Sequence, residues 1–150
     1  MIFPYVRHRV GESSAIPSGE IARPEILVRI IGPHGFVEVS GLIDTGADQV
    51  FLPVMLAEYL GIEIDADQAE LAAGAGGHEL KMWPCEIELE ILRDDVSYRW
   101  IVQAGFIESD DDIAAAYLGH AGFLEYFRAT FDGDAQTVEL IPNHRLKSIS

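Results

Sequence analysis

Short apolar stretches separated by turn residues dominate the sequence from Glu25 onwards. Two of them, Ile26 to Ile31 and Phe36 to Ile43, are joined by Gly32-Pro33-His34-Gly35. That connection is rich in residues that favour tight turns. The pattern therefore predicts two antiparallel strands linked by a short hairpin turn.

A strict alternation of acidic and aliphatic residues runs from Glu86 to Ile91. A period of two predicts a strand whose three aliphatic side chains face the core and whose three glutamates, including Glu90, face water. Arg93-Asp94-Asp95 then predicts a turn into a further strand, Tyr98 to Ala104, and Thr137 to Ile141 predicts a closing strand. The expected fold is mostly β.

Helical patterns are few and short. Leu52 to Gly61 predicts a helix of about two turns, with Pro53 in its first turn and Gly61 as its stop. Ala121 to Phe127 predicts a second short helix. We therefore expect one or two short helices beside the strands.

The first 25 residues have no clear period because Pro4, Pro17, Pro24 and the cluster Gly11 to Ser14 interrupt it. We predict an N-terminal arm or irregular extension over residues 1–25 and one globular domain over residues 26–150, since a chain of 150 residues has the usual length of one domain.

The charge of the chain limits its partners. Ten Lys and Arg residues against 25 Asp and Glu residues give a formal net charge of −15. Such a field repels phosphate backbones and acidic membrane surfaces, so we expect no nucleic-acid partner and no direct membrane contact. A single cysteine, Cys85, excludes an internal disulfide, and we expect a cytoplasmic protein without a secretory signal.

The candidate chemistry lies at Asp44-Thr45-Gly46-Ala47, directly after the apolar pair Leu42-Ile43. A carboxylate at the end of a buried strand, on a turn that a glycine allows to bend sharply, is how half of an aspartic protease site is built. The sequence contains no second Asp-Thr-Gly or Asp-Ser-Gly. One chain would hold half an active site, and two chains would be needed to complete it.

A second candidate element is the glycine-rich stretch Gly74-Ala75-Gly76-Gly77 between two segments that can pair as strands. Glycine reaches positive φ at low cost and is easily disordered. The stretch is typical of a mobile hairpin tip, which is consistent either with a lid or with an ordinary flexible loop.

Taken together, the apolar strand before Asp44-Thr45-Gly46-Ala47-Asp48, the glycine-rich hairpin and Tyr117-Leu118-Gly119 resemble the retropepsin-like aspartic proteases, the single-domain relatives of retroviral protease. The resemblance runs from about Ile26 to Leu140. It implies a closed, barrel-like β fold with the active site at a homodimer interface and no cofactor.

The resemblance also implies roles for individual residues. Asp44 of each chain would form a catalytic dyad that activates a water, and Thr45 and Gly46 would support the site. Substrate would be an extended peptide or protein segment, bound by Gly46, Ala47, Asp48 and the flap residues Gly74, Ala75, Gly76 and Gly77. The expected activity is that of an aspartic endopeptidase.

The sequence departs from the retroviral pattern after Gly119. An Arg usually follows there and ties the active-site loop through an ion pair, whereas this chain has His120-Ala121-Gly122. We expect His120 or a main-chain contact to replace that support.

Other interpretations of the same residues stay open. Asp44-Thr45-Gly46 is also compatible with an ordinary strand-to-loop turn, and the chain with a catalytically inactive module that dimerises or holds a peptide. The first 25 residues are compatible with a dimer contact, a regulatory arm in the cleft, or the leader of a zymogen-like or membrane-tethered protease. The five histidines and the acidic runs lack metal-ligand spacing, so we expect no metal.

Overall fold

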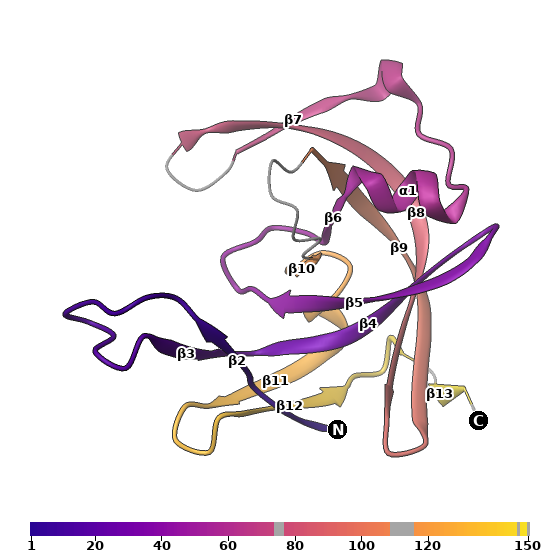
Figure 1. Cartoon of the computed structure of the whole chain (residues 1–150). Coiled ribbons are helices and arrows are strands. Elements are labelled where there is room, and N and C mark those ends of the chain that lie inside the picture. The colour runs from indigo at the N-terminus through magenta and orange to yellow at the C-terminus, as the bar shows by residue number, and fades with distance from the viewer. Residues whose placement is uncertain (74–76, 109–115, 147, 150) are drawn as a thin grey trace.

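The computed structural model describes residues 1–73, 77–108, 116–146 and 148–149, and most of them lie in strands (Figure 1). The strands are β1 (Ile2–Pro4), β2 (Val6–Arg9), β3 (Glu20–Arg23), β4 (Glu25–Gly32), β5 (Gly35–Ile43), β6 (Phe51–Pro53), β7 (Glu70–Ala73), β8 (Glu79–Arg93), β9 (Val96–Ile107), β10 (Ala116–Leu118), β11 (Phe127–Asp132), β12 (Thr137–Pro142) and β13 (Ser148–Ile149). The helical elements are α1 (Val54–Leu60) and the 3₁₀ turns η1 (Ala66–Gln68) and η3 (Leu124–Tyr126). The prediction of a mostly β fold is confirmed.

Six strands form a closed barrel. Their order is β9-β6-β10-β5-β4-β8, and the pairing of β8 with β9 closes the ring. β7 and β13 extend this sheet beyond the ring, while β1, β12 and β11 form a separate three-stranded sheet. The barrel interior is filled by aliphatic and aromatic side chains such as Ile30, Leu89 and Phe106, all fully buried.

The predicted hairpin between β4 and β5 is confirmed. The register places Gly32 opposite Gly35, so Pro33 and His34 form a two-residue connection. Gly35 has φ 119°, a conformation that side chains rarely adopt, which explains why a glycine ends this turn.

The longest hairpin, β8–β9, follows the predicted alternation with one exception. Ile87, Leu89 and Ile91 are buried as expected. Glu90 was expected in water, but its exposed fraction is only 8%, so that prediction is wrong.

Glu90 is buried because the folded chain surrounds it with hydrogen-bond donors. Its carboxylate accepts a 2.6 Å bond from the Ser97 hydroxyl and lies 3.3 Å from Arg29 Nη1 and 3.4 Å from Arg99 Nη2. Burial by itself raises the pKa of Glu90, but the bonds from Ser97 and Arg29 and the charge of Arg99 outweigh it and lower the pKa. The sequence pattern could not show this because the two arginines come from other strands.

The first predicted helix is confirmed and the second is shorter than expected. α1 begins after Pro53, which is its N-cap, and ends at Gly61 in the left-handed conformation with φ 69°. Within the predicted helix at residues 121–127, only the single 3₁₀ turn η3 forms, because β11 begins at Phe127.

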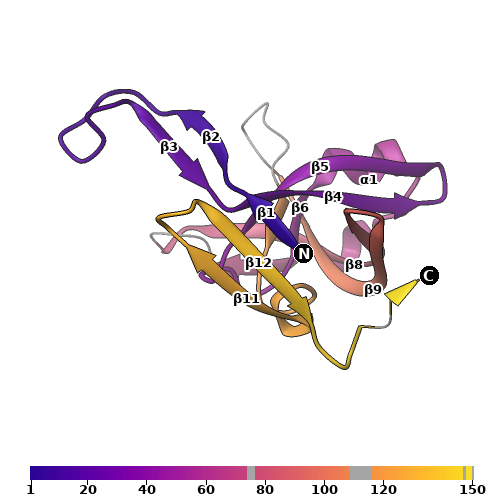
Figure 2. The same ribbon diagram turned by 90° about the horizontal axis from the view of Figure 1, so that it is seen from below.

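The first 25 residues contain strands, although their sequence has no regular period. β1 pairs with β12 in the three-stranded sheet, and β2 pairs with β3 as a separate hairpin. This hairpin extends away from the barrel (Figure 2). The division into an arm and a domain at residue 25 stays a prediction.

Within the described ranges, every helix is too short or too polar to cross a membrane.

Candidate active site

Asp44 lies immediately after β5, where the strand leaves the barrel. Ile43 is buried, whereas Asp44 is half-buried and Thr45 and Gly46 are exposed. Asp44 Oδ1 accepts a 2.8 Å hydrogen bond from the Gly46 amide, and the Ala47 amide donates to the Asp44 carbonyl oxygen at 3.2 Å. The carboxylate is thereby held in a fixed orientation by its own turn.

Gly46 is needed for this arrangement because of space. A Cβ atom at this position would lie 3.1 Å from Asp44 Oδ1. That is closer than most real Cβ contacts, so a side chain at position 46 would disturb the carboxylate that the amide orients.

β10 is inserted between the two strands that flank the Asp44 loop. It pairs in parallel with β5, with Leu118 opposite Ile43, and in antiparallel fashion with β6 through Tyr117 and Phe51. The Asp44 amide donates to the Leu118 carbonyl oxygen at 3.2 Å. The loop carrying Asp44 is thus anchored on both of its sides by one strand from much later in the sequence.

Gly119, the residue after β10, lies very close to the backbone of the Asp44 loop. A Cβ atom here would lie 2.4 Å from the carbonyl oxygens of both Ala47 and Gln49. These are backbone atoms that cannot move aside easily. The close approach of residue 119 to the backbone of residues 47–49 therefore requires a glycine. The Leu118-Gly119 pair identified in the sequence therefore contacts the Asp44 loop directly.

His120 supports the loop from the same segment. Its Nε2 lies 2.7 Å from the Thr45 carbonyl oxygen, and its amide donates to the Ala47 carbonyl oxygen at 3.0 Å. The Ala121 amide donates to the Asp48 carbonyl oxygen at 2.9 Å. Both supports considered from the sequence, the imidazole and the main chain, are present.

A cluster of aromatic side chains lies behind this segment. Trp100 Nε1 donates a 2.9 Å bond to the Gly122 carbonyl oxygen, and its ring contacts Phe123, Tyr126 and Phe127 at centroid distances of 6.0, 5.9 and 5.7 Å. The segment that braces Asp44 is therefore fixed to the barrel wall through β9.

Glu125 adds a polar anchor that sequence reasoning missed. One carboxylate oxygen accepts from the Gly122 amide at 2.7 Å and the other pairs with Arg145 Nη1 at 2.7 Å. Asn143 Nδ2 also donates to the Glu125 carbonyl oxygen at 2.7 Å. No local pattern connects residues 125, 143 and 145, so only the fold could identify this cluster.

The remaining residues predicted from the sequence are placed as follows. Ala47 is half-buried and Asp48 is exposed, both on the Asp44 loop. Among the described residues, the Thr45 hydroxyl has no hydrogen bond, and it lies at the surface. Gly74, Ala75 and Gly76 lie outside the described residues, and Gly77 has φ 78°.

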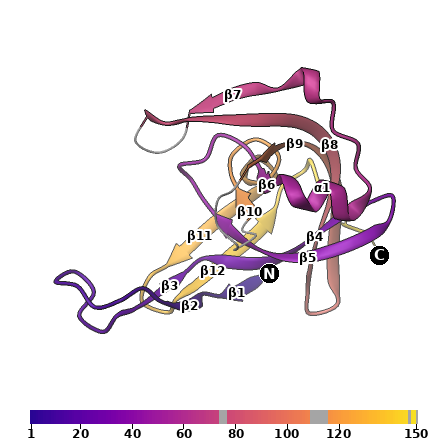
Figure 3. The same cartoon turned by 45° about the horizontal axis from the view of Figure 1, so that its top comes forward.

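The hairpin that carries the glycine-rich stretch is present. β7 and β8 pair in antiparallel fashion, with Ala73 opposite Glu79. Figures 1 and 3 show this hairpin extending to the same side of the molecule as the loop between β5 and β6. Its function as a flap stays a prediction.

Gln49 links the base of this hairpin to the Asp44 loop. Its side-chain amide contacts the sulfur of Met82 on β8, and Met82 is buried. Met82 in turn packs where Gly105 of β9 leaves room for it, since a Cβ atom there would clash with its side chain. Neither Gln49 nor Met82 stood out in the sequence.

No three His, Cys, Asp or Glu side chains converge on a possible metal site in the part of the chain that the structure describes. The chemical groups that the candidate site does offer are one oriented carboxylate, exposed main-chain groups and a hydroxyl.

The comparisons with known proteins give structural similarity only. No family model and no curated protein matches the chain. Among solved structures, the chain is similar to a retropepsin-like aspartic protease from Rickettsia conorii, with a TM-score of 0.49 and 17% identity over 91% of this chain and 98% of that chain. Values this low do not assign the two proteins to one family.

Proposed function

We propose that the chain is one half of a homodimeric aspartic endopeptidase, in which Asp44 of each copy forms the catalytic dyad. The observation that carries this proposal is the fixed carboxylate of Asp44, oriented by the Gly46 amide and braced by Leu118, Gly119 and His120. An ordinary turn needs no such bracing from a distant strand.

In peptide hydrolysis, one of two facing carboxylates acts as the general base and the other as the general acid. Because like charges at short range cannot both ionise easily, the pair holds one proton, and the apparent pKa values belong to the pair. The ionised carboxylate takes a proton from a bound water as this water attacks the scissile carbonyl carbon. The protonated carboxylic acid gives its proton to the carbonyl oxygen, which forms a tetrahedral gem-diol. The carboxyl group that took the water proton then gives it to the amide nitrogen, while the other carboxylate takes a proton from a gem-diol hydroxyl. The C–N bond breaks, the amine leaves, and the pair again holds one proton.

The neighbouring residues fit this arrangement. Thr45 is exposed beside Asp44. In the proposed dimer its hydroxyl would bond the same loop of the second copy and hold the two carboxylates together. Gly46, Ala47 and Asp48 offer main-chain groups to an extended peptide, and the β7–β8 hairpin projects on this side of the molecule and would cover it (Figure 3).

The test compares wild type with Asp44→Asn. Both proteins are incubated with a mixed peptide library across a range of pH values, cleavage products are identified by mass spectrometry, and the oligomeric state is measured by sedimentation. We expect cleavage by the wild type, loss of at least about a thousandfold in the variant, and the same dimer in both. Asp134→Asn, on the exposed β11–β12 turn, is the matched control and should cleave like wild type.

Two results would contradict the proposal. A wild-type protein that dimerises and binds peptides without cleaving them would favour the inactive dimerisation or peptide-binding module. A strict monomer at all concentrations would exclude a dyad built from two copies of Asp44.

A further inference from the structure

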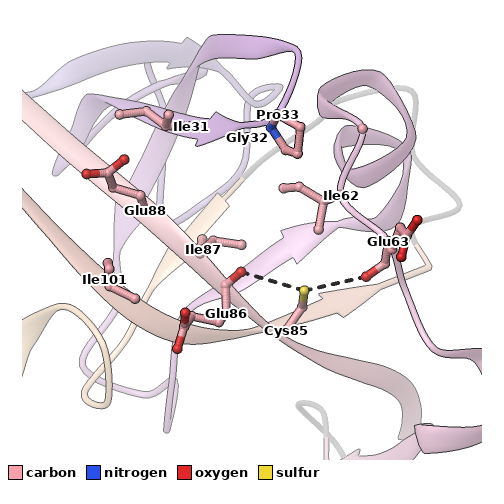
Figure 4. A pocket seen from close by; sticks show the side chains of 11 residues that line it. Ile31, Gly32, Pro33, Ile62, Glu63, Cys85, Glu86, Ile87, Glu88 and Ile101 are labelled. Atoms are coloured by element: carbon pink, nitrogen blue, oxygen red, sulfur yellow. Dashed lines mark hydrogen bonds between the residues drawn. The ribbon is translucent and has the colours of Figure 1, made fainter.

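A groove lies at the end of the barrel where β4 turns into β5 (Figure 4). Its volume is about 590 Å³, which is within the usual range of ligand sites. It is lined by residues of the β4–β5 turn, the end of α1, β8 and β9: Ile31, Gly32, Pro33, Gly61, Ile62, Glu63, Cys85, Glu86, Ile87, Glu88 and Ile101.

One wall of this groove is formed by the β4–β5 turn and the end of α1, which pack closely against each other. A Cβ atom at Gly32 would lie 2.8 Å from the Leu60 carbonyl oxygen, and one at Gly61 would lie 2.6 Å from His34 Nε2. The His34 amide also donates to the Leu60 carbonyl oxygen at 3.0 Å. The groove is therefore shaped by backbone contacts and is formed before any ligand arrives.

The β-sheet side of the groove is an apolar row interrupted by a carboxylate. Register places Ile31 of β4 opposite Glu88 of β8, and Glu88 opposite Ile101 of β9. Ile101 is 60% exposed, a large apolar surface left open to water. Figure 4 shows the side chains of this row together with Ile62 on the opposite wall.

The charge of the groove is negative. Three glutamates line it, at positions 63, 86 and 88, and among the residues that the structure describes no lysine or arginine does. Glu88 Oε1 lies 3.8 Å from Arg99 Nε, a long ion pair at the surface. A surface pair of this kind contributes little and leaves the carboxylate available to another cation.

This groove is separate from the Asp44 site. No residue of the Asp44 loop lines it. It lies at the Gly35 end of β5, whereas Asp44 follows the other end at Ile43, and a strand of that length spans roughly 27 Å.

We propose that this groove is a docking site for an extended peptide segment in which aliphatic residues alternate with lysine or arginine. Aliphatic side chains would cover Ile31, Ile62 and Ile101, and the basic side chains would pair with Glu86 and Glu88. Charge complementarity selects this occupant, because an acidic or phosphorylated segment would meet three carboxylates. The proposal does not depend on catalysis by Asp44.

The experiment measures binding of a fluorescent, capped peptide of sequence Val-Arg-Ile-Arg-Val to the full-length chain, with Val-Glu-Ile-Glu-Val as the opposite probe. Asp44→Asn serves as the background, so that the probe is not cleaved. We expect the basic probe to bind and the acidic probe not to bind. The double substitution Glu86→Gln and Glu88→Gln should weaken binding at least tenfold, and so should Ile101→Ser.

The matched control removes the same charge elsewhere. Glu12→Gln with Glu58→Gln changes two exposed glutamates outside the groove and should alter binding less than twofold. Equal loss in the two double variants would overturn the proposal, because the long-range field of the chain would then account for the attraction. Absence of binding by the basic probe would overturn it as well.

A second measurement uses Cys85, which lines the groove. Bound probe should slow alkylation of Cys85 by iodoacetamide at least threefold, whereas unchanged alkylation at saturating probe would place the peptide elsewhere and overturn the proposal. A change in oligomeric state on Ile101→Ser would instead assign the groove to a second copy of the chain.

Discussion

The imidazole of His120 lies with its Nε2 2.7 Å from the carbonyl oxygen of Thr45, the residue next to Asp44. A nitrogen at this distance from a carbonyl oxygen donates a hydrogen bond to it, so the tautomer with the proton on Nε2 is the one that fits. The contact joins the segment after β10 to the loop after β5. His120 directly follows Gly119, at the position where the retroviral pattern has an arginine.

Removing the His120 imidazole should loosen the Asp44 loop. We expect His120→Leu to lower the free energy of unfolding by about 1 kcal/mol, the usual contribution of one hydrogen bond. The amides of Gly46 and Ala47 should exchange hydrogen faster, and kcat on any cleaved peptide should fall more than KM rises. Hydrogen exchange followed by mass spectrometry, thermal denaturation and steady-state kinetics measure the three effects.

The variant His120→Gln is the control for this prediction, because its side-chain amide can still donate to the Thr45 carbonyl oxygen. It should recover most of the protection from exchange. Equal exchange rates in wild type and His120→Leu would show that the main-chain bonds alone hold the loop.

Gly119 should tolerate no side chain. In Gly119→Ala the new methyl group would meet two backbone carbonyl oxygens at 2.4 Å, so we expect a loss of about 2 kcal/mol or more in the free energy of unfolding. Chemical denaturation monitored by tryptophan fluorescence measures it. The control is Gly133→Ala, because a Cβ atom at residue 133 would meet nothing within 4 Å. It should change the free energy of unfolding by less than about 0.5 kcal/mol. Similar losses in both variants would mean that the backbone contacts at Gly119 do not destabilise Gly119→Ala.

Stability should fall in acid partly through Glu90. Its pKa in the folded chain is lowered from the ordinary value of 4.5, so its contribution is fully present above that value and is lost as the pH falls through the folded-state pKa. We expect Glu90→Gln to destabilise the protein by about 1 to 3 kcal/mol at neutral pH, because Arg29 and Arg99 lose their partner. The difference from wild type should shrink as the pH falls below the ordinary value of 4.5.

Urea denaturation of both proteins at several pH values tests this, with Glu58→Gln on the exposed face of α1 as the control. A stability difference that stays constant down to pH 3 would mean that Glu90 contributes through packing and not through its charge.

Cys85 should react slowly with alkylating reagents. Burial raises the pKa of its thiol, and the charge of Glu86 raises it further, against a smaller opposing effect of the Glu86 main-chain contact. Less thiolate is therefore present at pH 8 than for a free cysteine. We expect alkylation by iodoacetamide to be several times slower than in the urea-unfolded chain, and faster in Glu86→Gln than in wild type. A rate equal to that of the unfolded chain would contradict the raised pKa.

Elements whose signal is local were predictable from the sequence. The β4–β5 hairpin, the turn at Asp94 and Asp95, and the helix ended by Gly61 all depend on turn residues and on one apolar period. The Asp44 turn was predictable for the same reason, since Gly46 and Asp44 interact across two residues.

Features that depend on distant segments were not predictable. The burial of Glu90 requires arginines from β4 and β9, and the strands within residues 1–25 form only because β12 accepts β1 and because β2 pairs with β3. The second predicted helix is reduced to one turn because the strand beginning at Phe127 pairs with β12. In each case a long-range pairing overrides the local pattern.

The sequence by itself determined the strand-rich character of this chain, its acidic charge and the Asp-Thr-Gly turn, because periodicity and turn chemistry act over a few residues. Only the tertiary structure decided that β10 lies between β5 and β6. That placement brings Gly119 and His120 against the Asp44 loop. The closed barrel also brings Gln49, between β5 and β6, against Met82 of β8. Contacts between residues so far apart form only when the barrel closes, since closure supplies the shared surface on which they meet.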